Sequence, residues 1–499
     1  MSSSTARSPL FFLTLLAAVV LASFYLRIQF DFNTGHMDEY DYLFVGKRLL
    51  SGETWPSYSY IFGSDFNWYL LGWGEKNLGG LSGARIVAGA FGLLSLLGMY
   101  WLAYSLWQRH LTAVIATALL CIQPIQLFIS RFATYDIISF ACFSLALAPL
   151  FLACTQTGRK KYGYLLISIA FMSLAITSKY VVILYLPVIA GLAFLYNRKV
   201  GFIFGSAVGL VLLIYVSVHW VSLQTLYQVQ IVGVHGSGNS SAEHIIEIVS
   251  TYLFALAVAW LIALLWSVRL QPERFWQQAS FKKLLLLLLL AFPMVAYHWQ
   301  ALNMIALYKH LVYASFFLVL AVAWLFTSFL ESESFPRLKQ GLAMCALIAI
   351  SQVSYQQLKT IESGYANVSS VIEYSKDDLT AKDSILSEDP YLFRYLGEAT
   401  IPQSQIKESG WLDNNLDGKH EQQDVIDAVW DTKFEYVFLN DQLHPELNIK
   451  LRNILETKKY KSLVDEAYEN SNVMSRQVTG RLSLYQRAQP PKVSLGVNE

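Results

Sequence analysis

Residues 9–30 read PLFFLTLLAAVVLASFYLRIQF, and residues 34–43, a few positions further on, read TGHMDEYDYL. The first stretch is apolar and has the length, about 20 residues, that an α-helix needs to cross the hydrocarbon core of a bilayer. The second stretch brings Asp38, Glu39 and Asp41 together directly after that helix. Carboxylates in this position are typical either of a solvated loop or of a functional site at the membrane surface. The two stretches together predict a membrane protein and make the acidic pair its first candidate site.

The composition extends the membrane assignment to most of the chain. With 499 residues, 55% of them hydrophobic and 15% charged, and a mean hydropathy of +0.40, the chain is too apolar for a soluble protein of this size. A net charge of +1 excludes the basic field that nucleic-acid binding requires. The cysteines are widely spaced within apolar runs, which argues against a disulfide framework and a zinc site: Cys121, Cys142, Cys154 and Cys345.

The apolar runs predict about eleven transmembrane helices, counted by the length of a membrane span. Basic residues fall in alternate loops, which indicates that those loops are cytoplasmic. Arg27 lies beyond the first apolar run and no small-x-small cleavage site follows it, so we expect a retained helix rather than a signal peptide. The expected centres are Leu16, Leu93, Leu119, Leu145, Ile169, Val188, Leu210, Val258, Leu288, Leu320 and Ile348.

The chain divides into residues 1–355, the membrane domain, and residues 356–499, a polar domain that an odd number of spans places outside the cytoplasm. The polar part alternates strand-like runs, SILSE at 384–388 and YVFLN at 436–440, with helical patterns. No Gly-rich phosphate fingerprint follows these strands, so a nucleotide-binding unit is not expected. The predicted fold class is therefore a polytopic α-helical membrane protein with a small C-terminal α/β extracytoplasmic domain.

Several ionisable side chains fall on the same predicted outer side as the acidic pair. Each has an ordinary explanation on its own: a solvated loop, a snorkelling lysine, a salt bridge between helix ends or an interfacial anchor. Their occurrence together predicts one site with a base, a charge partner and an anion-binding wall. Asp136 follows a short link that carries Arg131, Lys179 lies in the turn ITSKYVV, and the stretch HWQALNMIALYKHLVYASFF contains His298, Lys309, His310 and Tyr313.

The order of these motifs resembles the membrane-embedded glycosyltransferases of the GT-C class, and most closely the protein O-mannosyltransferase and lipid A aminoarabinose transferase group. The resemblance covers residues 1 to about 355. It departs in one respect, because no arginine follows the acidic pair directly and the nearest basic residues are Lys47 and Arg48. The matching motifs are the Asp38–Glu39 pair, the aromatic loop 53–80, Asp136 after Arg131, the Thr-Ser-Lys turn at Lys179, and a late Lys309 with Tyr313.

The resemblance implies a polyprenyl-phosphate sugar as donor and a hydroxyl group of a glycan, lipid or protein as acceptor. Asp38 then removes the acceptor proton as general base, in a hexosyl or pentosyl transfer that inverts the anomeric centre. Cations stabilise the departing phosphate, and Arg131, Lys179, Lys309 and His310 are the candidates. Glu39, Asp136 and Tyr313 complete the expected substrate-binding set. No metal or other cofactor is expected, and the implied location is a bacterial inner membrane with the site facing outward.

Two other classes of function remain open from the residues alone. A lipid or sugar transporter or flippase also carries polar residues in its helices, but it typically has broken helices and internal repeats, whereas here the ionisable residues crowd one face. A membrane scaffold that presents the outer domain has no need of the carboxylates. Convergence of Asp38, Glu39 and Asp136 in one outward cavity is the observation that favours the enzyme.

Overall fold

The computed structural model describes residues 9–28, 37–53, 64–228, 240–270, 272–304, 306–332, 336–363, 365–397, 401–412, 414, 421–441, 444–458, 460–471 and 477–488. His36 and part of the aromatic loop, residues 54–63, lie outside these ranges. The chain forms two compact units. The membrane unit is Met1–Phe30 with Val45–Lys359, and the C-terminal unit is Thr360–Glu499 together with the short segment Asp31–Phe44.

The membrane unit is helical, and all eleven predicted centres fall within its helices. Among the described residues, eight helices are long and apolar enough to cross a membrane, and His110–Cys121 and Tyr180–Tyr196 are shorter apolar helices. The predicted fold class of this part is therefore confirmed. The eight are α1 (Pro9–Ile28), α4 (Gly80–Trp107), α7 (Tyr135–Thr155), α8 (Lys160–Ser178), α10 (Arg198–Val218), α12 (Ala242–Leu270), α13 (Ala279–Ala301) and α14 (Leu307–Glu331).

Shorter helices connect these spans. They are α2 (Met37–Leu50), α3 (Asp65–Leu78), α5 (His110–Cys121), α6 (Pro124–Ile129), η2 (Tyr180–Leu184), α9 (Tyr185–Tyr196), α11 (Trp220–Leu226) and η4 (Pro272–Gln277). Helix α15 (Pro336–Ser363) follows α14 and has 28 residues, but it is not among the eight candidate spans. The sequence predicted an aromatic loop at residues 53–80, and the structure forms α3 within it. Helix α2 starts with Asp38 and Glu39 and ends with Lys47 and Arg48. This charge order complements the helix dipole, which favours acids at the first turn and bases at the last.

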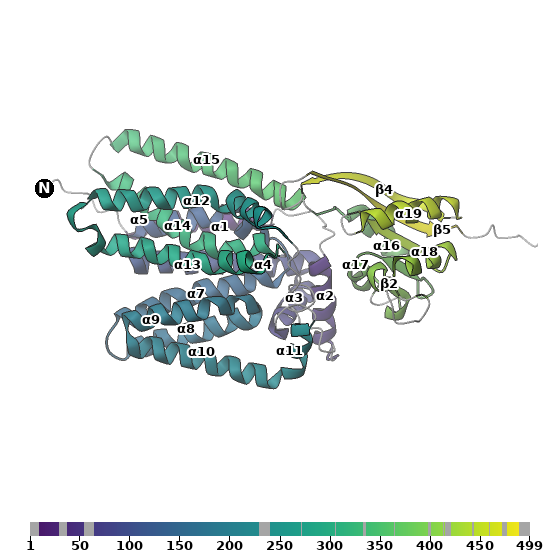
Figure 1. Cartoon of the computed structure of the whole chain (residues 1–499), viewed down its shortest axis with the longest axis horizontal. Helices are drawn as coiled ribbons and strands as arrows, with labels where there is room; N and C mark the ends of the chain where they lie inside the picture. The colour runs from purple at the N-terminus through teal and green to yellow at the C-terminus, as the bar shows by residue number, and fades with distance from the viewer. Residues whose placement is uncertain are drawn as a thin grey trace, which may run out of the picture. The chain divides into compact units, whose positions relative to one another are not determined.

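Helices α7 and α14 form the interior of the membrane unit. The most apolar 18-residue window of each is 78% and 83% buried, against 22% for α10 and α13. A helix that is apolar on all sides and surrounded by protein belongs to a core, whereas α10, α12 and α13 expose large apolar side chains such as Leu210, Phe254 and Phe292. Figure 1 shows α12, α13 and α14 running alongside one another. Groups at the ends of α7 and α14 are therefore carried by the most deeply buried helices among the candidate spans.

Close packing of α4 against α7 depends on a glycine. A Cβ atom added at Gly98 would lie 2.8 Å from the carbonyl carbon of Ser144 and 2.9 Å from its Cβ. Small residues at such crossings let two helix backbones approach, which is a common way for membrane helices to associate. This contact fixes α7 and hence the residues at its amino-terminal end.

The C-terminal unit contains a five-stranded sheet of order β2-β1-β3-β5-β4. Strands β1 (Ile385–Ser387), β2 (Ile406–Glu408) and β3 (Tyr436–Asn440) are parallel, and β5 (Gln477–Arg487) runs antiparallel between β3 and β4 (Tyr460–Ser471). Its core packs the sheet against α18 (Gln422–Trp430) and α19 (Pro445–Thr457). The remaining helices are α16 (Ser369–Asp378), α17 (Pro390–Leu396), η5 (Gln403–Gln405) and η6 (Ser409–Trp411). The small α/β domain is confirmed, with β1 and β3 at the predicted runs.

Candidate functional site

Three helices of the membrane unit bring one carboxylate and two ammonium groups together. Asp136 is the second residue of α7, Lys179 follows the last residue of α8, and Lys309 is the third residue of α14. The Lys179 Nζ binds Asp136 Oδ1, and the Lys309 Nζ lies 3.6 Å from Asp136 Oδ2. Thr134 Oγ1 donates a hydrogen bond to the same Oδ2 at 3.1 Å. We call Asp136, Lys179 and Lys309 the charged triad.

The charged triad is withdrawn from solvent. The side chains of Lys179, Lys309 and Asp136 are 8%, 9% and 5% exposed. Taking a charge out of water costs several kcal/mol per ion, so such groups persist only when they are paired. Two ammonium groups against one carboxylate leave the triad with an excess positive charge, which suits a site that receives an anion. The Lys179 ammonium also lies 5.3 Å from the centroid of the Tyr135 ring.

Two histidines adjoin the triad. His298, near the end of α13, makes a 2.7 Å hydrogen bond through Nδ1 to the carbonyl oxygen of Asn303, and its Nε2 lies 2.8 Å from Nδ1 of His310. A carbonyl oxygen only accepts, so Nδ1 of His298 carries hydrogen. If His298 is neutral, its Nε2 accepts from Nδ1–H of His310, which fixes the orientation of both rings. His310 was a candidate from the sequence, and the structure adds His298, twelve positions earlier in the chain, as its hydrogen-bond partner.

Tyr313 lies one turn beyond Lys309 on α14, inside the protein. Its hydroxyl is 3.2 Å from Ser139 Oγ, which itself donates to the carbonyl of Ala175 at 2.8 Å. Phe140 and Phe143 present their edges to its ring, with centroids 5.4 and 5.1 Å away. These contacts to α7 hold Tyr313 in the interior of the membrane unit.

A second group of basic side chains consists of arginines. Of these, Arg131 was a candidate from the sequence, whereas Arg27 and Arg85 were not. Arg131 donates from Nε and Nη2 to the carbonyl of Leu26, at 2.9 and 2.7 Å, and so holds the end of α1. Arg27 is 2% exposed and binds Ser23 and Gln126, and its Nε has no hydrogen-bond partner among the described residues. A cavity of about 110 Å³ lies beside Arg27 and Arg85. The signal for Arg27 was present in the sequence, as an arginine that ends an apolar run.

The acidic pair belongs to the C-terminal unit, because the segment Asp31–Phe44 groups with residues 360–499. Asp38 and Glu39 occupy the first turn of α2, where Asp38 is half-buried and Glu39 is 0% exposed. Further along the same helix, Lys47 lies 3.6 Å from Glu75 and Arg48 pairs with Glu53. The structure therefore joins Asp136, Lys179 and Lys309 directly, and the convergence of Asp38 and Glu39 with them stays a prediction.

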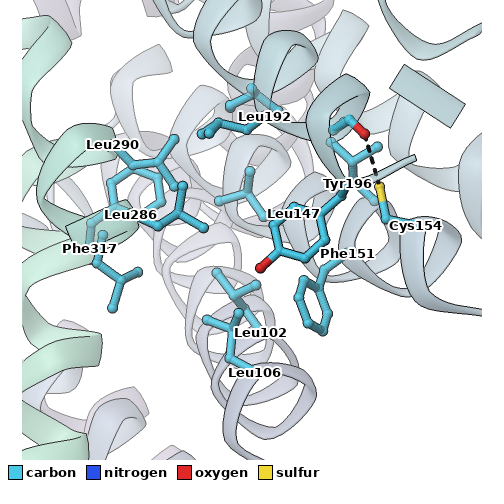
Figure 2. Close-up of a pocket in the computed structure, with 14 residues that line it drawn as sticks. Leu102, Leu106, Leu147, Phe151, Cys154, Leu192, Tyr196, Leu286, Leu290 and Phe317 are labelled. Carbon is cyan, nitrogen blue, oxygen red and sulfur yellow. Dashed lines mark hydrogen bonds between the residues drawn. The ribbon is translucent and has the colours of Figure 1, made fainter. Parts of the chain in front are cut away.

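An apolar crevice of about 90 Å³ is lined by α4, α7, α9, α13 and α14, away from the triad (Figure 2). Figure 2 shows Leu286, Leu290 and Phe317 on one side of it and Leu147, Phe151 and Tyr196 on the other. Leu147 is eleven residues from Asp136 along α7, about 16 Å at 1.5 Å per residue. Its walls carry hydrocarbon and almost no polar surface, so this crevice suits packing or lipid rather than chemistry. The remaining lining residues are Leu102, Leu106, Leu150, Cys154, Ile189, Leu192, Ala193 and Leu287.

Comparisons with known proteins agree with this geometry. Residues 14–234 match the family described as dolichyl-phosphate-mannose-protein mannosyltransferase. ArnT from Cupriavidus metallidurans bound to undecaprenyl phosphate has a TM-score of 0.58 at 13% identity, over 97% of this chain and 100% of that chain. AglB, the oligosaccharyltransferase of Archaeoglobus fulgidus in complex with an inhibitory peptide and a dolichol-phosphate, has a TM-score of 0.53 at 13% identity, over 97% and 75%. No curated protein matches the sequence.

The family match over residues 14–234 and the shared fold agree with the resemblance inferred from the motifs. The chain is a multi-pass membrane protein whose fold is similar to those of ArnT and AglB.

Proposed function

We propose that this chain transfers one sugar, a hexosyl or pentosyl group, from a polyprenyl phosphate to a hydroxyl group at the outer face of a bacterial inner membrane. The observation that supports it best is the buried charged triad with the adjoining histidines, at one end of α7, α8, α13 and α14. The solved neighbours of the same fold are bound to undecaprenyl phosphate and dolichol-phosphate. A buried cationic site inside a membrane body is suited to the phosphate of such a lipid.

In the proposed reaction, Asp38 accepts the proton of the acceptor hydroxyl as its oxygen bonds to the anomeric carbon. The bond from that carbon to the phosphate oxygen breaks, and the polyprenyl phosphate leaves with the electron pair. A single displacement of this kind inverts the anomeric configuration. The leaving group gains a negative charge, which preorganised cations stabilise. We assign this role to Lys179 and Lys309, with Asp136 fixing their positions.

The remaining candidates take supporting roles in the proposal. His310, as an imidazolium, donates from Nδ1 to His298 and from Nε2 to the phosphate or its ester oxygen. Glu39 holds sugar hydroxyls, and Tyr313 and Arg131 keep α14 and α1 in place. An apolar cavity of about 350 Å³ is lined by α12 and α13, with Val295 and Trp299 in its wall. We assign it to the first isoprene units of the donor. The proposed chemistry uses side chains alone, without a metal or other cofactor.

The outward orientation rests on the charge distribution along individual helices. Helix α7 starts at the triad and ends at a loop that carries Arg159, and α13 starts beside Lys282 and Lys283 and ends at His298. Basic loops are retained in the cytoplasm, which favours an outward triad. A reporter fused after residue 360 is expected to be active only outside the cytoplasm.

Asp38→Asn tests the proposed base. Asparagine keeps the size of the side chain and removes its basicity, so transfer should fall by roughly 10² to 10⁴-fold while donor binding survives. The substrates are membranes from a strain that lacks the gene, since these hold both the unused donor and the unmodified acceptor. Mass spectrometry of glycans, lipids and proteins measures the product. A variant that transfers sugar at the wild-type rate would exclude Asp38 as the base.

The same assay separates transfer from transport. Protein purified in detergent has no compartments, so a flippase yields no covalent product under these conditions, whereas a transferase does. Product formation by the wild type and its loss in Asp38→Asn are the expected pair of results. Donor that remains intact in the presence of folded wild-type protein would favour the transporter.

A further inference from the structure

Carboxylate side chains gather at the carboxyl ends of two parallel strands in the C-terminal unit. Glu388 and Asp389 follow β1, and Glu408 is the last residue of β2. In open α/β sheets, ligands bind outside the carboxyl ends of parallel strands. Here this edge lies close to the amino-terminal turn of α2, which belongs to the same unit.

Contacts within the C-terminal unit hold that turn. The rings of Tyr40 on α2 and Tyr395 on α17 have centroids 5.7 Å apart. Asp41 is 5% exposed, and Asp38, Asp389, Glu408 and Arg394 are near enough for their charges to act on it. We call these four carboxylates and Arg394 the acidic cluster. The acidic cluster links Asp38, the candidate base, to α17 through Arg394 and to β2 through Glu408.

Two oxygen atoms of the acidic cluster are buried without a partner. Among the described residues, Asp41 Oδ1 and Asp389 Oδ2 have no hydrogen-bond donor. Asp389 is 2% exposed and uses its other oxygen to accept from the backbone of Leu392 at 3.4 Å, as the N-cap of α17. A buried, unpaired carboxylate oxygen is costly, and a bound proton removes most of that cost.

The charge balance also requires protons. Four carboxylates face one guanidinium, so the fully ionised cluster would carry three excess negative charges in a partly buried space. Burial raises the pKa of Asp41 well above its usual range, and the charge of Asp38 raises it further. Burial likewise raises the pKa of Asp389 to about 7 and raises that of Glu408. In the described part of the chain, no group of three or more His, Cys, Asp or Glu side chains is arranged to hold a metal ion.

We propose that the C-terminal domain positions the catalytic segment through this cluster. Asp41 is a neutral, protonated acid, and Asp389 and Arg394 are positioning residues that fix the first turn of α2 and hence Asp38. Because the neighbouring acids carry protons, Asp38 remains ionised and available as a base. The inference rests on the proposed function, in which Asp38 takes the acceptor proton.

The protons can be detected without any substrate. Full-length protein in detergent is examined by infrared difference spectroscopy for the carbonyl absorption of protonated carboxyl groups, at about pH 5 and about pH 8, either side of the neutral range in which a buried acid titrates. We expect part of this absorption to persist at the higher pH and to vanish in Asp41→Asn, and a second part that titrates near neutrality to vanish in Asp389→Asn. Spectra of both variants identical to the wild type would overturn the inference.

The positioning role is tested by transfer kinetics with the membranes described above. Arg394→Gln should lower kcat tenfold or more with little change in the donor KM, and Arg394→Lys should restore most of the loss because it keeps the charge. Arg487→Gln is the matched control, since Arg487 binds Glu435 in the same domain at a distance of 2.7 Å and has no place in the cluster. The positioning role would be contradicted if Arg394→Gln were as active as the wild type, or if Arg394→Gln and Arg394→Lys lost the same activity.

A pH profile distinguishes positioning from a general loss of folding. Asp389 carries its proton at the pH where an aspartate base titrates, so Asp389→Asn changes no charge there and should leave the acid limb of the kcat/KM profile in place. An acid limb that moves down by about half a pH unit or more would contradict the protonated state of Asp389. Full activity of Asp38→Asn would contradict the proposed function instead, and the infrared result would still decide where the protons lie.

Discussion

Replacing Asp136 by asparagine removes the carboxylate that lies between the ammonium groups of Lys179 and Lys309. The three side chains are between 5% and 9% exposed, so bulk water cannot take over the role of the lost charge. Breaking a buried ion pair by removing one partner typically costs about 3–5 kcal/mol. For a domain of a few hundred residues, that corresponds to a fall in Tm of roughly 5–15 °C.

Thermal unfolding of the purified protein in detergent, followed by tryptophan fluorescence, measures this fall. Lys309→Met is the companion variant, since it leaves Asp136 paired with Lys179 and should cost much less. In the double variant one ammonium remains unpaired instead of two, so the combined loss should be smaller than the sum of the single losses. A fall equivalent to less than about 1 kcal/mol for Asp136→Asn would mean that the triad is solvated, as surface pairs are.

Two further predictions concern parts of the chain outside the triad. Burial raises the pKa of Glu388 to about 7 from its usual 4.5, so the folded C-terminal domain holds a proton that the unfolded chain releases, and its stability falls as pH rises across that window. Pulse proteolysis should show that Glu388→Gln removes about 3 kcal/mol of this pH dependence, whereas exposed Glu446→Gln leaves it intact. Gly98→Ala should destabilise the membrane unit by roughly 1–3 kcal/mol because of its contact with Ser144, and Gly209→Ala, with open space around it, should not.

Most of the membrane fold follows from local sequence. Apolar length identifies a span without knowledge of its neighbours, so each of the eleven predicted centres lies in a helix. Helix α3 was not predicted because Gly72 and Gly74 lower its intrinsic helix propensity. The structure shows why they are there, since Gly74 packs against the backbone of Gly83. Strand β2 has three residues and exists through its pairing with β1, which no local pattern reveals.

The charged triad was predictable in outline. Membrane sidedness places Asp136, Lys179 and Lys309 at the same face, because each lies at the end of a span whose other end is basic or leads to a basic loop. The contacts themselves join residues 43 and 173 positions apart from Asp136, and only helix packing determines them. The assignment of Asp38–Phe44 to the C-terminal unit is of the same kind, because it depends on a sheet formed more than 340 residues later.

Environment, rather than residue type, distinguishes the carboxylates of this protein. Asp136 has two ammonium partners, so its charge is compensated and it serves as a fixed anchor for cations. Asp41 is as deeply buried but faces further acids, so a proton is the partner that stabilises it. Asp38, three residues earlier on α2, is half-buried and keeps access to a substrate. A general base must be reachable by its substrate, and among these three aspartates Asp38 is the least buried, as the proposed role requires.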